Sequence, residues 1–342
     1  MHPELFKLPF IHLAVQSYGL MMVIGFLMAV YLIRRLSRNI TPDPQLITNA
    51  ALYSLIAGVA GARLFYVIHH LDEFQSGPAS FFAIWKGGLE LLGGVILAIA
   101  IIFFYLWRHK LPIRRYLDIL AVALMLALAF GRIGCFLRGC CFGKPSGVPW
   151  AVRFPYGSDA YYSQILPNLK RNRPEPQLEL PIEFFGYVGK DGLFYSGLKP
   201  YEYLSDQQKE QVDKGPYRCL PVHPTQLYSS ANALICCLVL YLFWRRSQKA
   251  DKSQNVRKLF TKPGSTFALM FILYGVTRFL LEFLRDDNPF ESGWWIVYRG
   301  GTISQTLGIY MVIFGALWMI IFEKMKPDKL TLRDSRLVKT LA

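Results

Sequence analysis

The sequence predicts an all-α polytopic membrane protein with about seven transmembrane helices and one larger, outward-facing loop subdomain of mixed structure. Three observations predict this fold class. Hydrophobic residues make up 53% of the 342 residues. They occur in runs close to the roughly 20 residues that span a bilayer, and not in the alternation of a half-buried strand. Clusters of basic residues follow every second run, which is the pattern of cytoplasmic loops.

Seven apolar runs approach spanning length, although single Arg, Glu or Gly residues interrupt several of them. The first ten residues, MHPELFKLPF, lack the basic region and the small-residue cleavage site of a signal peptide, so we expect the first run to be retained. The runs cover residues 13–33, 47–68, 88–107, 116–136, 225–244, 265–284 and 303–322.

The net charge of +15 would suggest a nucleic-acid partner in a soluble protein. Here a basic cluster follows each odd-numbered run, so the charge marks membrane topology instead. This pattern predicts an amino terminus outside, a carboxy terminus in the cytoplasm, and no nucleic-acid partner. The clusters are Arg34, Arg35 and Arg38; Arg108, Lys110, Arg114 and Arg115; Arg245, Arg246 and Lys249; and Lys324, Lys326 and Lys329.

This orientation divides the chain into four parts. The segment 144–223 faces outward, and its Pro-rich connector and its Gly-rich, aromatic stretches are typical of short strands and turns. We expect 1–143 to hold the first four helices and the signature segment described below. The remaining parts are the loop subdomain 144–223, the last three helices in 224–324, and a basic cytoplasmic tail in 325–342.

The arginines within the runs, and one glutamate, lie toward the outward ends of the runs. They are Arg63, Arg132, Arg278 and Glu282. An intramembrane arginine costs at least about 2.5 to 3.5 kcal/mol on insertion scales, so several at similar depth indicate a functional site. Arg278 and Glu282 can pair across one helical turn, but one carboxylate cannot neutralise three arginines. A phospholipid phosphate is the abundant anion at this depth, and guanidinium groups suit its oxygens.

Other residues fall near these charges. Tyr274 and Arg285 share the helical face of Arg278 and Glu282, at steps of four, four and three residues. His223 opens the fifth run in the segment HPTQLY. The glycine pair in WKGGLELLGG that ends at 94 suits either a turn whose amides face a ligand or close packing between helices.

The segment GRIGCFLRGCCFGKPS after the fourth run resembles the signature of prolipoprotein diacylglyceryl transferases. Six further segments resemble the family in the same order along the chain. The resemblance implies that the lipobox thiol of a prolipoprotein attacks the glyceryl carbon of phosphatidylglycerol, forming a thioether and releasing glycerol phosphate. It places the protein in the bacterial inner membrane, with phosphatidylglycerol and prolipoprotein signal peptides as partners. The segments are SYGLMMVIGF, AGARLFYV, WKGGLELLGG with HPTQLY, LYGVTRFLLEFLRDD and TISQTLG.

The resemblance also implies site residues. Two arginines match the family's essential arginines, two tyrosines its site tyrosines, and one glycine a signature glycine. With the polar face above, the expected catalytic residues are Tyr18, Arg132, His223, Tyr274, Arg278 and Glu282. The expected phosphatidylglycerol-binding residues are Arg63, Gly93, Gly94, Arg132, Gly143, Arg278 and Arg285. We expect no cofactor and no metal ion.

Three positions depart from the family pattern. Leu92 stands where members carry His or Tyr, Cys135 replaces an asparagine, and Cys140 replaces an acidic residue. Thiol attack needs a proton acceptor or a field that lowers the thiol pKa. His223, Glu282, a tyrosine or the arginine field alone are the candidates. The alternative function is therefore a relative with altered or lost chemistry that binds phospholipid, or a transporter of lipids or organic anions.

The chain contains six cysteines. Two in the fifth run, Cys236 and Cys237, are interpreted as small apolar residues. For those in the signature segment, three hypotheses remain open: a disulfide from Cys140 or Cys141 to Cys219, a vicinal redox pair, or a metal site. The last would combine Cys135, Cys140, Cys141 and His223, at a spacing that fits no established zinc pattern.

Overall fold

The computed structural model describes residues 4–7, 14–38, 43–71, 88, 90–252 and 260–325. Within these ranges, six helices are long and apolar enough to cross a membrane, and α3 is a shorter apolar helix. The prediction of an all-α polytopic membrane protein is confirmed, with one helix shorter than a usual span. The expected tail 325–342 lies almost wholly outside the described residues.

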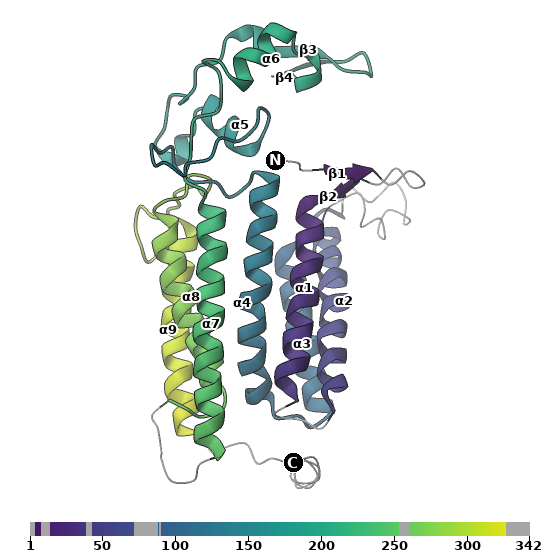
Figure 1. The fold of residues 1–342 in the computed structure, drawn as a ribbon, viewed down its shortest axis with the longest axis vertical. Helices are drawn as coiled ribbons and strands as arrows, with labels where there is room; N and C mark the ends of the chain where they lie inside the picture. The colour runs from purple at the N-terminus through teal and green to yellow at the C-terminus, as the bar shows by residue number, and fades with distance from the viewer. Residues whose placement is uncertain are drawn as a thin grey trace. The chain divides into compact units, whose positions relative to one another are not determined.

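The seven apolar helices follow the seven predicted runs (Figure 1). The first begins later than predicted, because residues 14–16 form a strand. The fifth is longer than predicted, because the polar residues after 244 continue the helix. The helices are α1 (Ser17–Ser37), α2 (Pro44–His69), α3 (Leu91–Arg108), α4 (Ile113–Arg138), α7 (Thr225–Lys252), α8 (Ser265–Glu282) and α9 (Ile303–Lys324).

Shorter elements fill the amino-terminal segment and the stretch 144–223. Two antiparallel hairpins form, one from β1 (Glu4–Lys7) and β2 (Ala14–Gln16), and one from β3 (Phe185–Val188) and β4 (Phe194–Leu198). The short helices are α5 (Asp159–Ile165), η4 (Leu169–Arg171), η5 (Ile182–Phe184), η6 (Tyr201–Tyr203) and α6 (Asp206–Asp213).

The stretch 144–223 has a hydrophobic core of its own. Tyr161 and Phe184 are fully buried in it, together with Cys219 and Val222 near its end. Gln164 accepts a hydrogen bond from the Leu220 amide at 2.8 Å and donates one to the Leu220 carbonyl at 3.3 Å. This core fixes the backbone just before α7, where His223 lies.

The chain forms two compact units, each built from separate stretches of sequence. The first comprises 1–27, 124–241 and 268–318, and therefore holds the signature segment, the start of α7 and most of α8 and α9. The second comprises 28–123, 242–267 and 319–342, and holds α2 and α3.

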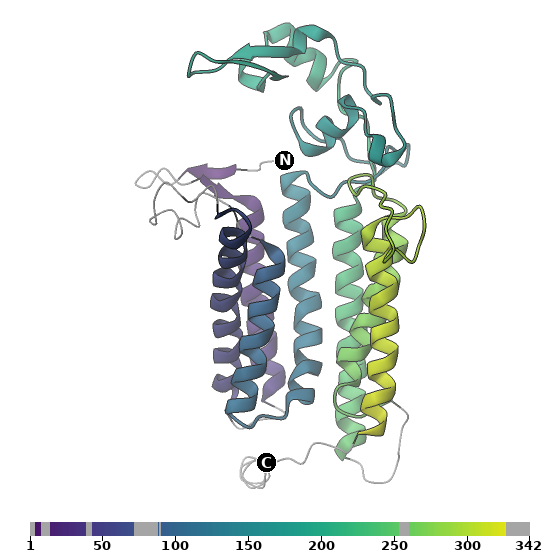
Figure 2. The same cartoon turned by 180° about the vertical axis from the view of Figure 1, so that it is seen from behind.

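In the second unit, α2 and α3 lie side by side, as both views show (Figure 1 and Figure 2). Glycines allow their close approach. A Cβ added at Gly61 would lie 2.5 Å from the carbonyl oxygen of Gly93, and one added at Gly94 would lie 2.8 Å from that of Gly58. Gly93 and Gly94 thus serve helix packing, one of the two roles that the glycine pattern suggested.

Within the second unit, a buried carboxylate in α4 accepts hydrogen bonds from backbone amides at the amino-terminal end of α8. Asp118 is 1% exposed. Its two oxygens accept hydrogen bonds from the backbone amides of Gly264 at 2.8 Å and of Phe267 at 3.0 Å. The first amides of a helix have no partner inside the helix, and a carboxylate also complements the positive end of the helix dipole. Asp118 therefore fastens α8 to α4.

We predict that Asp118→Ala lowers the free energy of unfolding by about 2 kcal/mol or more, because it leaves two buried amides without an acceptor. Asp118→Asn keeps one acceptor oxygen and should lose less. Thermal unfolding in detergent, followed by circular dichroism, measures both. Asp206→Ala is the matched control, since the Asp206 side chain is fully exposed. Equal stability of Asp118→Ala and this control would show that the carboxylate does not fasten α8.

Candidate functional site

The signature segment leaves α4 in a turn that the start of α7 holds in place. Thr225 Oγ1 donates a hydrogen bond to the Cys141 carbonyl at 2.8 Å, and Gln226 Nε2 donates one to the Cys140 carbonyl at 2.7 Å. Both donors are 1% exposed. Cys141 itself has a φ of 61°. A non-glycine residue in this left-handed region costs about 1 to 3 kcal/mol, so the surrounding contacts must impose the turn.

Gly143 lies between two other backbone segments. Its amide donates to the His223 carbonyl at 3.1 Å, and the next amide, Lys144, donates to the Leu284 carbonyl at 2.8 Å. A Cβ added at Gly143 would lie 2.6 Å from the His223 oxygen and 2.8 Å from the Leu284 oxygen. The glycine therefore lets the signature segment join the start of α7 to the end of α8. Its amide is hydrogen-bonded within the protein, to the His223 carbonyl.

The carboxylate of Glu282, at the end of α8, is fully buried and contacts several polar groups. Its Oε2 lies 3.0 Å from Nη1 of Arg278 and 3.8 Å from Nε of Arg285. Its Oε1 accepts hydrogen bonds from Thr302 Oγ1 at 3.0 Å and from Asn288 Nδ2. The predicted Arg278–Glu282 pair is present. It is the centre of a larger network that joins α8 to the start of α9.

Arg278 and Arg285 are held differently. Arg285 donates two hydrogen bonds to the carboxylate of Asp287, from Nε at 2.9 Å and from Nη2 at 2.6 Å. Arg278 pairs with Glu282 and also donates from Nη2 to Ser304 Oγ at 2.6 Å. Asp287 therefore occupies one edge of the Arg285 guanidinium with two hydrogen bonds. Arg278 is held in position by Glu282 and Ser304, and its side chain is 14% exposed.

Arg132, in the last turns of α4, is half-buried and has a different environment. It lies within electrostatic range of Tyr274, Cys141 and Arg285, and its charge also acts on Arg278. In the part of the chain that the structure describes, it makes no hydrogen bond or ion pair. Of the three predicted arginines, Arg278 and Arg285 are paired with Glu282 and Asp287, and Arg132 has no acidic partner among the described residues. This arrangement can bind an anion.

The two predicted tyrosines belong to the same cluster. Tyr18, near the start of α1, lies within electrostatic range of Arg132 and of the signature cysteines. Gly134 permits this contact, because a Cβ added there would lie 3.1 Å from the Tyr18 ring. Tyr274 lies one helical turn before Arg278, within range of both arginines. The structure therefore brings together Tyr18, Arg132, Tyr274, Arg278, Glu282 and Arg285.

The backbone of His223 is hydrogen-bonded to Gly143 and Lys144 of the signature segment, so the residue lies beside this cluster. Its ring is directed to Tyr228. Nδ1 lies 3.3 Å from the hydroxyl of Tyr228, and that hydroxyl accepts a hydrogen bond from Trp150 Nε1 at 2.6 Å. Neither ring nitrogen is bonded to the arginine network.

Three predicted phosphate-binding residues belong to the second unit. Arg63 is 8% exposed, and its Nη1 donates to the Gly88 carbonyl at 2.9 Å. Its guanidinium lies over the ring of Tyr66, 5.5 Å from the centroid. Gly93 and Gly94 pack against α2. A part for these three residues in phosphate binding stays a prediction.

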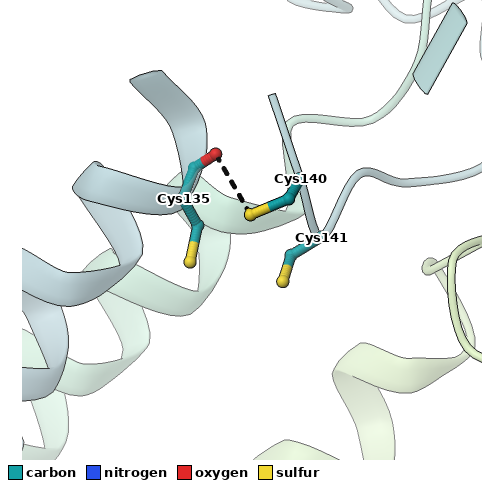
Figure 3. Close-up of side chains that lie close together, drawn as sticks. All are labelled: Cys135, Cys140 and Cys141. Atoms are coloured by element: carbon teal, nitrogen blue, oxygen red, sulfur yellow. Dashed lines mark hydrogen bonds between the residues drawn. The ribbon is translucent and has the colours of Figure 1, made fainter. Parts of the chain in front are cut away.

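The cysteines of the signature segment are free thiols that gather at the end of α4 (Figure 3). The hypothesis of a disulfide to Cys219 is wrong for this structure, because Cys219 is also free and lies in the core of 144–223. The neighbouring sulfurs of Cys135 and Cys140 lower the pKa of Cys141, and the charges of Arg285 and Arg132 lower it further. Burial raises the pKa of Cys219.

Sequence reasoning gave no role to five residues that hold the arginines and the turn. The run RDDN directly after α8 was a signal, since polar side chains at a helix end face whatever that end contacts. The polar start of α9, TISQ, was another. The residues are Thr225, Gln226, Asp287, Asn288 and Ser304.

Comparison with known proteins adds an independent finding. The family model for prolipoprotein diacylglyceryl transferase matches residues 3–321. The chain is 28% identical to the phosphatidylglycerol–prolipoprotein diacylglyceryl transferase of Clostridium tetani, over 92% of this chain and 95% of that protein. It is 27% identical to the enzyme of that name from Salmonella arizonae, over 92% of each. It is 26% identical to that of Synechococcus elongatus, over 92% of this chain and 87% of that protein.

We predict that Gly143→Ala lowers the free energy of unfolding by about 1 to 3 kcal/mol, because the new methyl group overlaps two backbone oxygens that cannot move independently. Gly147→Ala is the control, since a Cβ there meets nothing within 4 Å. Thermal unfolding of both variants in detergent provides the comparison. If both variants unfold at the same temperature, close packing does not explain Gly143.

Proposed function

Because this chain belongs to the prolipoprotein diacylglyceryl transferase family, we propose that its arginine cluster holds the headgroup phosphate of phosphatidylglycerol during the family's reaction. The protein is a membrane enzyme that transfers the diacylglyceryl group of phosphatidylglycerol to prolipoproteins. The observation that carries the proposal is Arg132, a half-buried arginine without an acidic partner among the described residues, beside an oriented Arg278.

In the proposed step, the lipobox thiol sulfur forms a bond to the glyceryl carbon. The bond from that carbon to the phosphate oxygen breaks, and this oxygen keeps the electron pair. A phosphodiester with one negative charge thereby becomes a glycerol phosphate with two. Preorganised donors stabilise charge that develops in the transition state more than charge that is already present in the substrate. The unpartnered charge of Arg132 is suited to this second negative charge.

Each arginine has a separate part in this proposal. Arg132 and Arg278 contact the phosphate oxygens, since Arg278 is fixed by Glu282 and Ser304 and keeps an exposed edge. Arg285 positions the other groups, because Asp287 occupies its Nε and Nη2. Its backbone also pairs with Gly143, so it ties the signature segment to the end of α8.

The thiol proton requires an acceptor other than residue 92. Leu92 has no titratable group, and its side chain is 62% exposed. The carboxylate of Glu282 already receives two hydrogen bonds and pairs with two arginines, so it orients groups and does not take up the proton. A neutral tyrosine cannot keep this proton, so in the proposed step Tyr18 or Tyr274, which lie beside both the arginines and the signature segment, relays it from the thiol to solvent.

We further propose that the protein lies in the bacterial inner membrane with its amino terminus outside and prolipoprotein signal peptides as its second substrate. Support comes from the bacterial relatives and from the distribution of basic residues: the last turn of α4 has Arg138 alone, whereas the last turns of α1, α3 and α9 together have four basic residues. These are Arg34 and Arg35 in α1, Arg108 in α3 and Lys324 in α9. Such residues mark the cytoplasmic ends of transmembrane helices.

We predict that the purified protein transfers labelled diacylglyceryl from phosphatidylglycerol to a synthetic lipobox peptide. Arg132→Ala and Arg278→Ala should each reduce transfer by about 100-fold or more, which is the usual cost of removing a donor to developing charge. The measurement is the labelled, gel-shifted peptide. Arg218→Ala, which changes an exposed arginine away from the cluster, should keep wild-type transfer.

Near-normal transfer by folded Arg132→Ala or Arg278→Ala would remove phosphate binding from the proposed roles of these residues. A wild-type protein that binds phosphatidylglycerol but transfers nothing would instead support the alternative of a phospholipid-binding relative with lost chemistry.

A further inference from the structure

Three thiols converge where α4 ends, in an arrangement that the transfer reaction does not require. Cys135 lies in the last turn of α4, and Cys140 and Cys141 lie in the turn that follows. Their Sγ atoms all lie within 4.8 Å of one another. Figure 3 shows the three side chains close together, and the Cys140 thiol donates a hydrogen bond to the Cys135 carbonyl at 3.8 Å. The geometry points to a binding site for a thiophilic d¹⁰ cation of the Zn²⁺ class, ligated by these three sulfurs.

The sulfur separations are close to those of a metal–thiolate site. Zinc–sulfur bonds are about 2.3 Å long, so sulfurs around one such ion lie roughly 4 Å apart. The observed limit of 4.8 Å means that the thiols must approach by less than about 1 Å. Side-chain rotation supplies this movement without a change in the backbone. Three protein ligands would leave one coordination position open.

The backbone that carries the thiols is already fixed. The carbonyl groups of Cys140 and Cys141 are hydrogen-bonded to the buried side chains of Gln226 and Thr225. Gly139 and Cys141 both have positive φ, at 88° and 61°. These conformations turn the chain back so that Cys140 and Cys141 face the helix end that carries Cys135. A site that is ordered before it binds loses little entropy when the ion enters.

The charges nearby favour the thiolate form that a metal requires. Metal binding releases the thiol protons, so groups that stabilise thiolates increase the affinity. Arg285 and Arg132 are cationic side chains that lie within electrostatic range of Cys141.

The sequence left a metal site of these three cysteines with His223 as one of three open hypotheses, at a spacing that fits no established zinc pattern. In the structure the three cysteines group together, and the His223 ring is directed to Tyr228 instead. Zinc sites that are recognised from sequence combine two separated pairs of ligands, each pair close along the chain. Here one helix end and the turn that follows it supply all three thiols. Only the turn at Cys141 brings them together, and the sequence does not show that turn.

The test is a titration of the full-length protein in detergent with Cd²⁺, using a purification tag without His or Cys and a phosphine reductant. Cadmium–thiolate bonds absorb in the ultraviolet, so the thiols report directly on binding. We expect saturation at one Cd²⁺ per protein and displacement of Cd²⁺ by an excess of Zn²⁺. Cys135→Ser, Cys140→Ser and Cys141→Ser should each weaken binding by about 100-fold or more, since the loss of even a supporting partner costs about 10- to 100-fold.

The matched control is the double variant Cys236→Ser with Cys237→Ser, which removes two thiols in α7 and should leave the titration unchanged. Circular dichroism identifies any serine variant that does not fold, and the remaining single variants then decide. Absence of the absorption band from a protein with all thiols reduced would overturn the site. So would a band that persists when the three cysteines are replaced together, or one that disappears in the α7 control. The readout is binding alone, so it does not depend on the transferase activity.

Discussion

The site depends on one buried carboxylate. Glu282 has no exposed side-chain surface, and it pairs with Arg278 and Arg285. Burying charges is costly unless each is paired and hydrogen-bonded, and a buried carboxylate without partners would destabilise the fold by several kcal/mol. Thr302 and Asn288 satisfy the remaining oxygen. Because these partners lie in α8, in the segment after it and just before α9, the neutralisation of one charge fixes the geometry of three segments.

The other parts of the site follow from this network. Asp287 neutralises Arg285 and Glu282 neutralises Arg278, so the positive charge that remains is that of Arg132 on α4. The backbone of Arg285 continues the connection, since it pairs with Gly143 of the signature segment. That segment in turn contacts His223 and the start of α7. The proposed phosphate site, a strained turn and a group of three thiols therefore share one set of backbone contacts.

The sequence predicted the features that arise within a single helix. The seven helices and the Arg278–Glu282 pair follow from apolar runs and from a spacing of four residues, which require no tertiary information. Arg132 came from its depth in the fourth run and Tyr274 from its helical face, and the family resemblance matched both; Tyr18 came from the resemblance alone. Asp287, Asn288 and Ser304 had no assigned role, because their partners depend on how the end of α8 meets α9. Depth alone grouped Arg63 with the site, and it could not show the bond to the Gly88 carbonyl.

An experimental structure of the protein with phosphatidylglycerol bound would test the central claim most directly. The account predicts phosphate oxygens within hydrogen-bonding distance, about 2.7 to 3.2 Å, of the guanidinium groups of both Arg132 and Arg278. It also predicts that Arg285 stays paired with Asp287. A headgroup that binds elsewhere, or an Arg132 that remains without a phosphate contact in the occupied site, would contradict it.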